Sequence, residues 1–290
     1  MKRLIAFLAF VACSPVLAAP VPGDAVQPID IGRSHTIASA ALREARTVNV
    51  VLPAGYAKEP EKRYPVLYLI DGGIGQDLLH VSGALHLGAL WGRSADAIVV
   101  GIETRDRRRE LVGPTRDPEL LKKYPTAGSS AAFRAFIRDE VKPLIERSYR
   151  TNGRDAVMGE SLAGLFILET YRDEPVLFDA YAAIDPSLWW DKEALSRSFA
   201  ARIGRHRNRQ PLYVAVAKEQ AETPSALRRV TAALEGTPSR WCLALRPDLL
   251  HSTIYQQLTP QALQFLLPPN APAPTQFGFN VQCSEKSPVM

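Results

Sequence analysis

Ser161 is the residue whose surroundings most clearly predict chemistry. It lies in the sequence Gly-Glu-Ser-Leu-Ala-Gly at 159–164, directly after the strand-like stretch 155–158 and before the apolar run 165–171. A strand, a tight turn carrying serine and a helix make up a nucleophile elbow, whose small neighbours let the serine adopt a strained backbone conformation. The pattern therefore predicts a nucleophilic serine, although Ala163 stands where the elbow usually has glycine. An ordinary serine helix cap is the alternative.

A serine hydroxyl becomes a nucleophile at neutral pH only when a base removes its proton, so the hypothesis requires a histidine. The chain has five histidines: His35, His80, His86, His206 and His251. In α/β-hydrolases the base follows the nucleophile in the chain, which leaves His206 and His251. His206 lies between two arginines, whereas His251 lies in a polar loop between the strand-like run 241–245 and the helical pattern 259–267. His251 is therefore the predicted base, and an uninvolved loop histidine is the alternative.

The third member of a catalytic triad is a carboxylate that accepts a hydrogen bond from the histidine. We expect it after the apolar run 212–217, where Glu219 is the first choice and Glu222 the second. Asp248 is a third candidate, only three residues before the histidine. A serine–histidine dyad without a carboxylate is also compatible with the sequence, as are surface roles for these side chains.

An oxyanion hole needs two N–H donors that point at one position. The N–H of Leu162, directly after the serine, is the first candidate. The second comes from Gly72 or Gly73, because the apolar run 66–70 ends in two glycines that let the backbone approach a substrate closely. A plain turn is the alternative for this glycine pair.

The elements that must position these residues alternate between short apolar runs and longer amphipathic ones. The predicted strands are 47–52, 66–70, 97–102, 156–158, 180–184, 212–217 and 242–245. The clearest helix is 129–147, in which Pro143 predicts a kink or break near 141–142. This alternation predicts a single α/β domain over residues 20–290, with a mainly parallel sheet covered on both faces. From Pro268 onward the chain is rich in proline, and we expect an extended strap over the surface.

The first 19 residues have a basic start, an apolar core and a small-residue exit, which is typical of a cleaved secretory signal peptide. A lipid anchor at Cys13 is a minor alternative. Loss of the leader lowers the formal net charge from +5 to +3, too mild a charge to predict a nucleic-acid partner. We expect a periplasmic or secreted protein, without stable membrane insertion after cleavage. The sequence leaves the oligomeric state open.

Two cysteines remain after removal of the leader, Cys242 and Cys283. In an oxidising compartment an even pair predicts a disulfide, here one that ties a late strand to the C-terminal tail. Enclosing about 40 residues, such a bond contributes roughly 3 to 4 kcal/mol by the loop-entropy model. Two buried free thiols are the alternative.

With these parts in order, the sequence resembles the putative-esterase family of α/β-hydrolases, which contains enterochelin and salmochelin trilactone esterases, S-formylglutathione hydrolase, feruloyl esterase domains and mycolyltransferases. The similarity covers most of the mature chain. It rests on residues 51–56 and 64–72, 109–111 with Pro114, the helix 133–145, the elbow 159–166 and the stretch 178–190. The resemblance implies the α/β-hydrolase fold and carries the catalytic roles onto Ser161 and His251.

Three positions depart from the family pattern. Ala163 replaces a glycine of the elbow, Asp185 stands where the siderophore esterase branch commonly has serine, and Ala217 replaces the glycine that usually marks the loop of the catalytic acid. The assignment of the acid therefore does not follow from the resemblance.

Trp189 and Trp190 follow the predicted strand 180–184 and are candidates for the wall of an acyl pocket, with Arg107 and Arg109 at its rim. Core packing is the alternative for at least one of the two indoles. We expect a serine esterase that forms an acyl-enzyme on a small-molecule ester, such as a siderophore trilactone, and that uses no metal or dissociable cofactor. The alternatives are an acyltransferase and a non-catalytic ligand-binding protein on a hydrolase scaffold.

Overall fold

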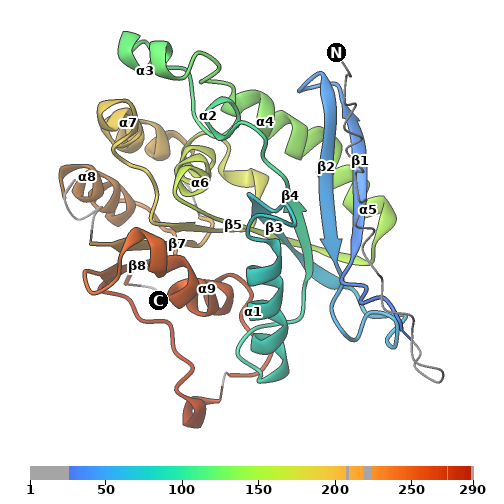
Figure 1. Ribbon diagram of the computed structural model, residues 1–290. Helices are drawn as coiled ribbons and strands as arrows, with labels where there is room; N and C mark the ends of the chain where they lie inside the picture. The colour runs from blue at the N-terminus through green and yellow to red at the C-terminus, as the bar shows by residue number, and fades with distance from the viewer. Residues whose placement is uncertain (1–25, 207–208, 219–223, 273, 289–290) are drawn as a thin grey trace, which may run out of the picture. The chain divides into compact units, whose positions relative to one another are not determined.

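The computed structural model describes residues 26–206, 209–218, 224–272 and 274–288 (Figure 1). Residues 26–31 have no helix or strand and are separate from the folded unit that begins at Gly32. The predicted signal peptide lies outside the described residues, and the predicted domain boundary at residue 20 stays a prediction. Among the described helices, none combines the length and the apolar character needed to cross a bilayer.

A nine-stranded sheet organises this unit, in the order β1-β2-β4-β3-β5-β6-β7-β8-β9. Pairing is parallel from β4 through β8 and antiparallel at β1–β2, β2–β4 and β8–β9, which confirms the predicted mainly parallel sheet. The strand bounds are β1 Arg33–Ser39, β2 Glu44–Val51, β3 Tyr64–Ile70, β4 Ile98–Ile102, β5 Thr151–Glu160, β6 Ala180–Ile184, β7 Leu212–Ala217, β8 Trp241–Arg246 and β9 Glu285–Lys286. The sequence analysis missed β1 and β9, the two edge strands.

The inner strands read as continuous apolar runs because helices bury both faces of the sheet. Alternate residues of β3 show this: Val66, Tyr68 and Ile70 join one apolar cluster, and Leu67 and Leu69 join the other. One face is covered by α1 and α9, which lie side by side in Figure 1, and the other by the remaining long helices. The helix bounds are α1 Leu78–Leu90, α2 Arg107–Glu110, α3 Pro118–Lys123, α4 Ser130–Phe136, η1 Ile137–Val141, α5 Lys142–Ser148, α6 Leu162–Asp173, η2 Pro175–Leu177, α7 Trp190–His206, α8 Pro224–Glu235, α9 His251–Leu266 and η4 Thr275–Phe277.

The predicted helix 129–147 is interrupted, as Pro143 indicated. α4 widens into a π-helical segment, η1, and then continues as α5 from Lys142, so the proline falls in the first turn of α5, where a missing N–H costs little. The predicted break near residues 141–142 is thereby confirmed. Phe133, Phe136 and Ile137 are fully buried against the sheet on this path.

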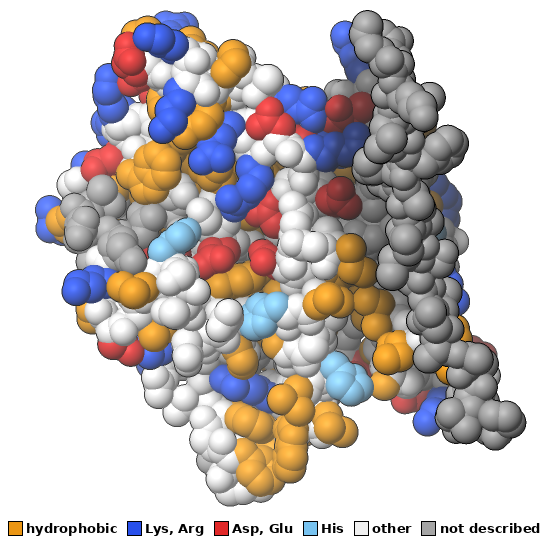
Figure 2. Space-filling view, viewed as in Figure 1, with side chains coloured by type: hydrophobic (Ala, Val, Ile, Leu, Met, Phe, Trp, Pro, Cys, Tyr) orange, Lys and Arg blue, Asp and Glu red, His pale blue; other side chains and the backbone are white. Residues whose placement is uncertain are grey.

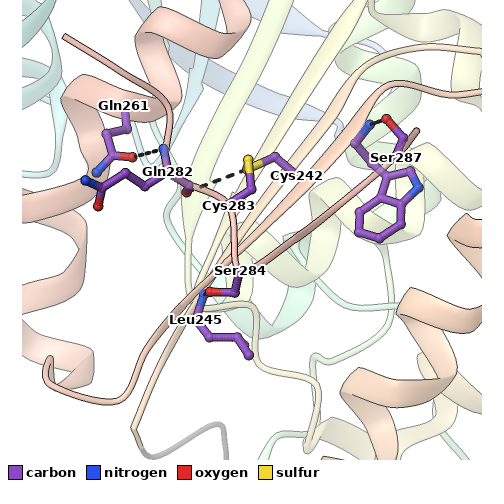
Figure 3. The surroundings of a disulfide bond; sticks show 8 residues. Cys242, Leu245, Gln261, Gln282, Cys283, Ser284 and Ser287 are labelled. Atoms are coloured by element: carbon purple, nitrogen blue, oxygen red, sulfur yellow. Dashed lines mark hydrogen bonds between the residues drawn. A yellow bond between two sulfur atoms is a disulfide. The ribbon is translucent and has the colours of Figure 1, made fainter. Parts of the chain in front are cut away.

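The predicted disulfide is present between Cys242 on β8 and Cys283 in the C-terminal tail, with their Cα atoms 5.4 Å apart (Figure 3). Hydrogen bonds on both sides hold the tail against neighbouring elements. Gln261 on α9 accepts the N–H of Gln282 at 2.9 Å, and Ser284 Oγ accepts the N–H of Leu245 at 2.9 Å. The tail is therefore joined to the sheet edge covalently and through its polar groups.

Candidate active site

Ser161 directly follows β5 and occupies the N-cap position of α6, in the strained backbone conformation that its sequence surroundings predict. Its φ is 61° and its ψ is −119°, a region that non-glycine residues seldom adopt. Small neighbours make this turn fit. A Cβ on Gly159 would come within 2.7 Å of the Ala163 methyl, and a Cβ on Gly164 within 3.0 Å of the Ile184 carbonyl oxygen. The single methyl that Ala163 adds is accommodated because Gly159 lies opposite it.

Three non-glycine residues with positive φ follow three neighbouring strands. Asp71 (φ 60°), Ser161 (φ 61°) and Asp185 (φ 42°) come directly after β3, β5 and β6. Because these strands are parallel, their carboxyl ends meet at one edge of the sheet, which is where α/β proteins carry their chemistry. Backbone strain concentrated at such an edge is typical of a functional site.

His251 is the first residue of α9, and its ring is held by a buried carboxylate. Its Nδ1 lies 2.5 Å from Oδ2 of Asp185, whose side chain is fully buried, whereas the histidine side chain is 43% exposed. The other carboxylate oxygen, Oδ1, accepts the N–H of Ala217 at 2.8 Å. Asp185 thus has a partner for each oxygen, and the Nδ1 contact directs Nε2 away from the carboxylate.

Among the described residues, the carboxylate in contact with His251 is Asp185, which the sequence analysis did not name as a candidate acid. Glu219 and Glu222 lie outside the described residues. Asp248, the third candidate, forms an exposed ion pair with Arg246, with Nη2 and Oδ2 2.6 Å apart. Asp185 was noted in the sequence only as a departure from a family motif. The position of Asp185 has a topological reason, because it follows β6, the strand next to β5, after which Ser161 lies.

The turn 185–187 contacts both the serine and the histidine. Ser161 donates its N–H to the Ile184 carbonyl at 2.9 Å, and Ser187 donates its N–H to the Ser161 carbonyl at 3.1 Å. The Ser187 hydroxyl lies 3.3 Å from Ser161 Oγ, while Asp185 of the same turn binds His251. One turn thus brings the predicted nucleophile and the predicted base to the same edge.

The N–H groups of the three predicted oxyanion donors have different hydrogen-bonding environments. Leu162 is the first residue of α6, so its N–H is among the helix-start groups without an intrahelical acceptor. Gly72 donates its N–H to the Ile102 carbonyl at 2.9 Å, and a Cβ there would lie 2.2 Å from Gly101 Cα. The prediction of Gly72 as a donor is therefore wrong: this glycine permits the close approach of β3 and β4. The Gly73 N–H bonds to Gln76 Oε1 at 2.9 Å, a side-chain partner that a substrate oxygen can replace.

Carboxylates outnumber cations around the serine. Burial, together with the charges of Asp77 and Asp185, raises the pKa of Glu160 to about 7, against the opposing influence of His251. Burial, followed by the charge of Asp71, raises the pKa of Asp77 to about 6. The cation among them is Arg107, whose guanidinium bonds to Asp71 and to the Glu160 carbonyl.

The same uneven distribution of charge is visible on the surface. Figure 2 shows acidic side chains close to a histidine in the middle of this face, with basic side chains gathered above them. Within the described residues, no cluster of His, Cys, Asp and Glu has the arrangement of a metal site.

Three of the predicted substrate-binding residues have different environments. Arg109 is wrong as a rim residue, because its guanidinium bonds to Glu44 and Glu110, away from the serine. Trp190 is only 5% exposed and packs against Tyr124, so it is the core member of the indole pair. Trp189 is 47% exposed and remains a candidate for contact with a substrate.

Sequence reasoning missed Arg107 as a partner of the site's carboxylates and Asp185 as the partner of His251. A usable signal existed for Asp185: it is an acidic residue directly after a five-residue apolar run, at the carboxyl end of a predicted parallel strand. For Arg107, the sequence suggested a place at the rim of the pocket, but nothing among the four arginines of residues 105–109 indicated which one meets the carboxylates of the site.

Comparisons with known proteins agree with this geometry. Residues 39–237 match the model of the family described as "Putative esterase". The ferri-bacillibactin esterase BesA of Bacillus subtilis is 26% identical over 264 residues, covering 80% of this chain and 89% of that protein. The siderophore enterobactin esterase of Emericella nidulans is 33% identical over 85 residues, covering 28% of each chain.

Among solved structures, an IroE-like serine hydrolase from Shewanella oneidensis aligns with a TM-score of 0.71 and 25% identity, covering 80% of this chain and 79% of that one. The family match spans more than half of the chain and includes the serine elbow, and the α/β fold accords with it. The chain belongs to the putative-esterase family of α/β-hydrolases and is a carboxylic ester hydrolase.

Proposed function

We propose that this protein hydrolyses siderophore esters through an acyl-enzyme, with Ser161 as nucleophile, His251 as general base and Asp185 as the carboxylate that orients the histidine. The observation that carries the proposal is the 2.5 Å contact between His251 Nδ1 and Asp185 Oδ2, made by a turn that also touches Ser161. A histidine held through Nδ1 presents Nε2 as the basic nitrogen, which is the arrangement that serine hydrolases use.

In the first step, Ser161 Oγ attacks the ester carbonyl carbon while its proton moves to His251 Nε2. The tetrahedral intermediate collapses as the bond between the acyl carbon and the oxygen of the leaving alcohol breaks, and the imidazolium gives its proton to that oxygen. Water then attacks the acyl-enzyme, giving its proton to His251, and the acid is released as Ser161 regains a proton. Asp185 keeps its contact with Nδ1 throughout and stabilises each imidazolium.

The oxyanion of both intermediates is assigned to the N–H groups of Leu162 and Gly73. The Leu162 N–H lies at the positive end of α6, a helix of 12 residues, which favours a developing negative charge. Gly73 contributes once the substrate oxygen takes the place of Gln76 Oε1.

The siderophore assignment rests on the relatives named above and on the side chains around Trp189. Trp189 meets Trp190 edge-on, Trp190 contacts Tyr124, and Arg108 lies over the Tyr124 ring at 4.6 Å. Aromatic faces beside cationic groups suit an anionic ligand with planar rings. We therefore place the bulk of the siderophore on this side of Ser161.

A periplasmic or secreted location belongs to the same proposal. The basic and apolar start of the sequence and the disulfide between Cys242 and Cys283 both favour an oxidising compartment. A single catalytic domain from residue 20 onward is proposed with it.

Labelling with a fluorophosphonate, followed by peptide mass analysis, tests the nucleophile. We expect one label per chain on Ser161, none in Ser161→Ala, and loss of most p-nitrophenyl ester turnover in Ser161→Ala and His251→Ala, with losses that do not add. An unlabelled wild-type protein would instead favour a ligand-binding protein.

A substrate panel tests the siderophore assignment separately. Siderophore trilactones, short acyl esters and feruloyl esters are compared by kcat/KM, and a trilactone is expected to rank first. Turnover that requires an added alcohol acceptor would instead identify an acyltransferase.

A further inference from the structure

Ser187 has a hydroxyl group at the predicted nucleophile for which the mechanism above has no use. Its Oγ lies 3.3 Å from Ser161 Oγ, and the residue is only 2% exposed. The contact comes from the turn 185–187 that also holds His251 through Asp185. A buried hydroxyl beside a reacting oxygen calls for a partner, because polar groups removed from water are rarely left unpaired.

The position of Ser187 is fixed independently of its hydroxyl. Its backbone N–H donates to the Ser161 carbonyl at 3.1 Å. The preceding residue, Pro186, packs closely against Gly164. A Cβ added to Gly164 would lie 3.1 Å from the Pro186 Cα. The backbone of the turn therefore seats against the start of α6, and removal of the Ser187 hydroxyl leaves these contacts in place.

We propose that Ser187 donates a hydrogen bond to Ser161 Oγ whenever that oxygen carries negative charge, and so accelerates both formation and breakdown of the acyl-enzyme. The inference rests on Ser161 being the nucleophile. At 3.3 Å the contact is longer than the usual 2.5 to 3.0 Å of an O–H···O bond, so it stabilises the resting hydroxyl little. A charged acceptor shortens and strengthens such a bond, and its effect is therefore greatest in the transition state.

Charge develops on Ser161 Oγ twice in each cycle. During acylation the O–H bond breaks as the proton moves to His251 and the Oγ–carbon bond forms. During deacylation the Oγ–carbon bond breaks, its electron pair passes to Oγ, and the imidazolium returns the proton. Ser187 keeps its own proton in both steps and contributes only the hydrogen bond. We expect the larger effect on deacylation, in which Oγ is the leaving group.

Kinetics of Ser187→Ala with p-nitrophenyl acetate test the proposal. The expected result is a fall in kcat of about 10 to 100-fold, as for loss of a donor to a developing charge, with KM changed less than about three-fold. The pre-steady-state burst should become more pronounced because deacylation slows more than acylation. Ser187→Thr, which keeps a hydroxyl at the same position, should recover most of the lost kcat.

Ser196→Ala is the matched control. Ser196 is also 2% exposed, but its hydroxyl donates to the Glu193 carbonyl at 3.0 Å, in α7. This variant should retain wild-type kcat and show the general cost of removing a buried hydroxyl, measured by thermal unfolding of both alanine variants.

Three results separate the outcomes. If Ser187→Ala keeps kcat within two-fold of wild type while Ser161→Ala is inactive, the role of Ser187 is overturned and the nucleophile assignment stays intact. Equal losses in Ser187→Ala and Ser187→Thr would also overturn it, since a packing role does not depend on the hydroxyl. An active Ser161→Ala would overturn the nucleophile assignment and this inference together.

Discussion

Two charge clusters meet at the short helix α2 and differ in how their charges are balanced. On one side, the fully buried Arg46 and Glu110 are joined by two hydrogen bonds of 2.7 and 2.8 Å, and Glu44 and Arg109 complete the group. On the other side, Arg107 meets Asp71, the charge of Asp77 adds to burial in raising the pKa of Glu160, and that of Asp71 adds to burial in raising the pKa of Asp77. We call these the paired cluster and the catalytic cluster.

The two clusters shift pKa values in opposite directions. A hydrogen bond from Arg109 lowers the pKa of Glu44 in the paired cluster, whereas burial raises that of Glu160 to about 7 in the catalytic cluster. Carboxylates that are matched by cations stay ionised and hold structure. Carboxylates that are buried without a match keep protons near neutral pH, which is more typical of functional sites than of structural ion pairs.

The largest expected effect concerns Asp185, the carboxylate that binds His251 among the described residues. Asp185→Asn should lower kcat/KM about 10² to 10⁴-fold, because an amide neither holds the same imidazole tautomer nor stabilises imidazolium. Steady-state kinetics on a p-nitrophenyl ester measures the loss, and circular dichroism checks the fold. Asp248→Asn, at an exposed carboxylate, is the control and should match wild type. Activity of Asp185→Asn within three-fold of wild type would remove Asp185 from the mechanism.

The next effect belongs to the paired cluster. Glu110→Gln should lower the free energy of unfolding by about 3 kcal/mol, because it leaves the Arg46 charge buried without its compensating carboxylate. Urea denaturation at pH 7 measures the change, and kcat per folded molecule should stay within two-fold of wild type. Asp139→Asn, which breaks an exposed pair with Arg138, should cost less than about 1 kcal/mol. Equal costs for the two variants would contradict the distinction between matched burial and surface pairing.

The smallest effect is a pH-dependent one in the catalytic cluster. The folded-state pKa of Glu160 is about 7 and its ordinary value is 4.5, so the native state holds this proton more tightly than the unfolded chain does. Native stability is therefore lost as pH rises between these two values and changes no further above them. Glu160→Gln removes this loss. Its stability relative to wild type should rise by on the order of 1 to 2 kcal/mol between pH 5 and pH 8, after allowance for solvent screening.

Urea denaturation of both proteins at the two pH values measures this difference. Because the charge of Asp77 raises the pKa of Glu160, the comparison reports the titration of these two interacting carboxyls together. A stability difference that is the same at pH 5 and pH 8 would show that Glu160 is ionised throughout, and the two clusters would then not differ in the way proposed.

Much of the fold followed from the sequence because the inner strands are buried on both faces and read as short apolar runs. The predicted strands 180–184 and 212–217 match β6 and β7 to the residue. The edge strands β1 and β9 were missed for the complementary reason: residues of β1 alternate between exposed and half-buried, and β9 has only two residues, both exposed.

The site residues that could be predicted are those identified by chain order or by the local backbone conformation. Those identified by contacts between distant segments could not be predicted. The small residues around Ser161 predicted a strained turn, and the order of catalytic residues along the chain favoured His251 as the base. Which carboxylate meets His251 depends on the neighbouring strand β6, and the fate of the Gly72 N–H depends on β4. Arg107 and Arg109 differ by two positions on a four-residue helix and therefore face different clusters.

The disulfide has a consequence for proteolysis. Cys242 and Cys283 close a covalent ring of the chain that contains His251 and all of α9. A protease that cut once in the proline-rich tail, between Pro268 and Gln282, would leave two polypeptides still linked through sulfur, with the histidine's helix retained on the sheet. Such nicked protein should run as a single species without reductant and as two fragments with it, while still turning over ester.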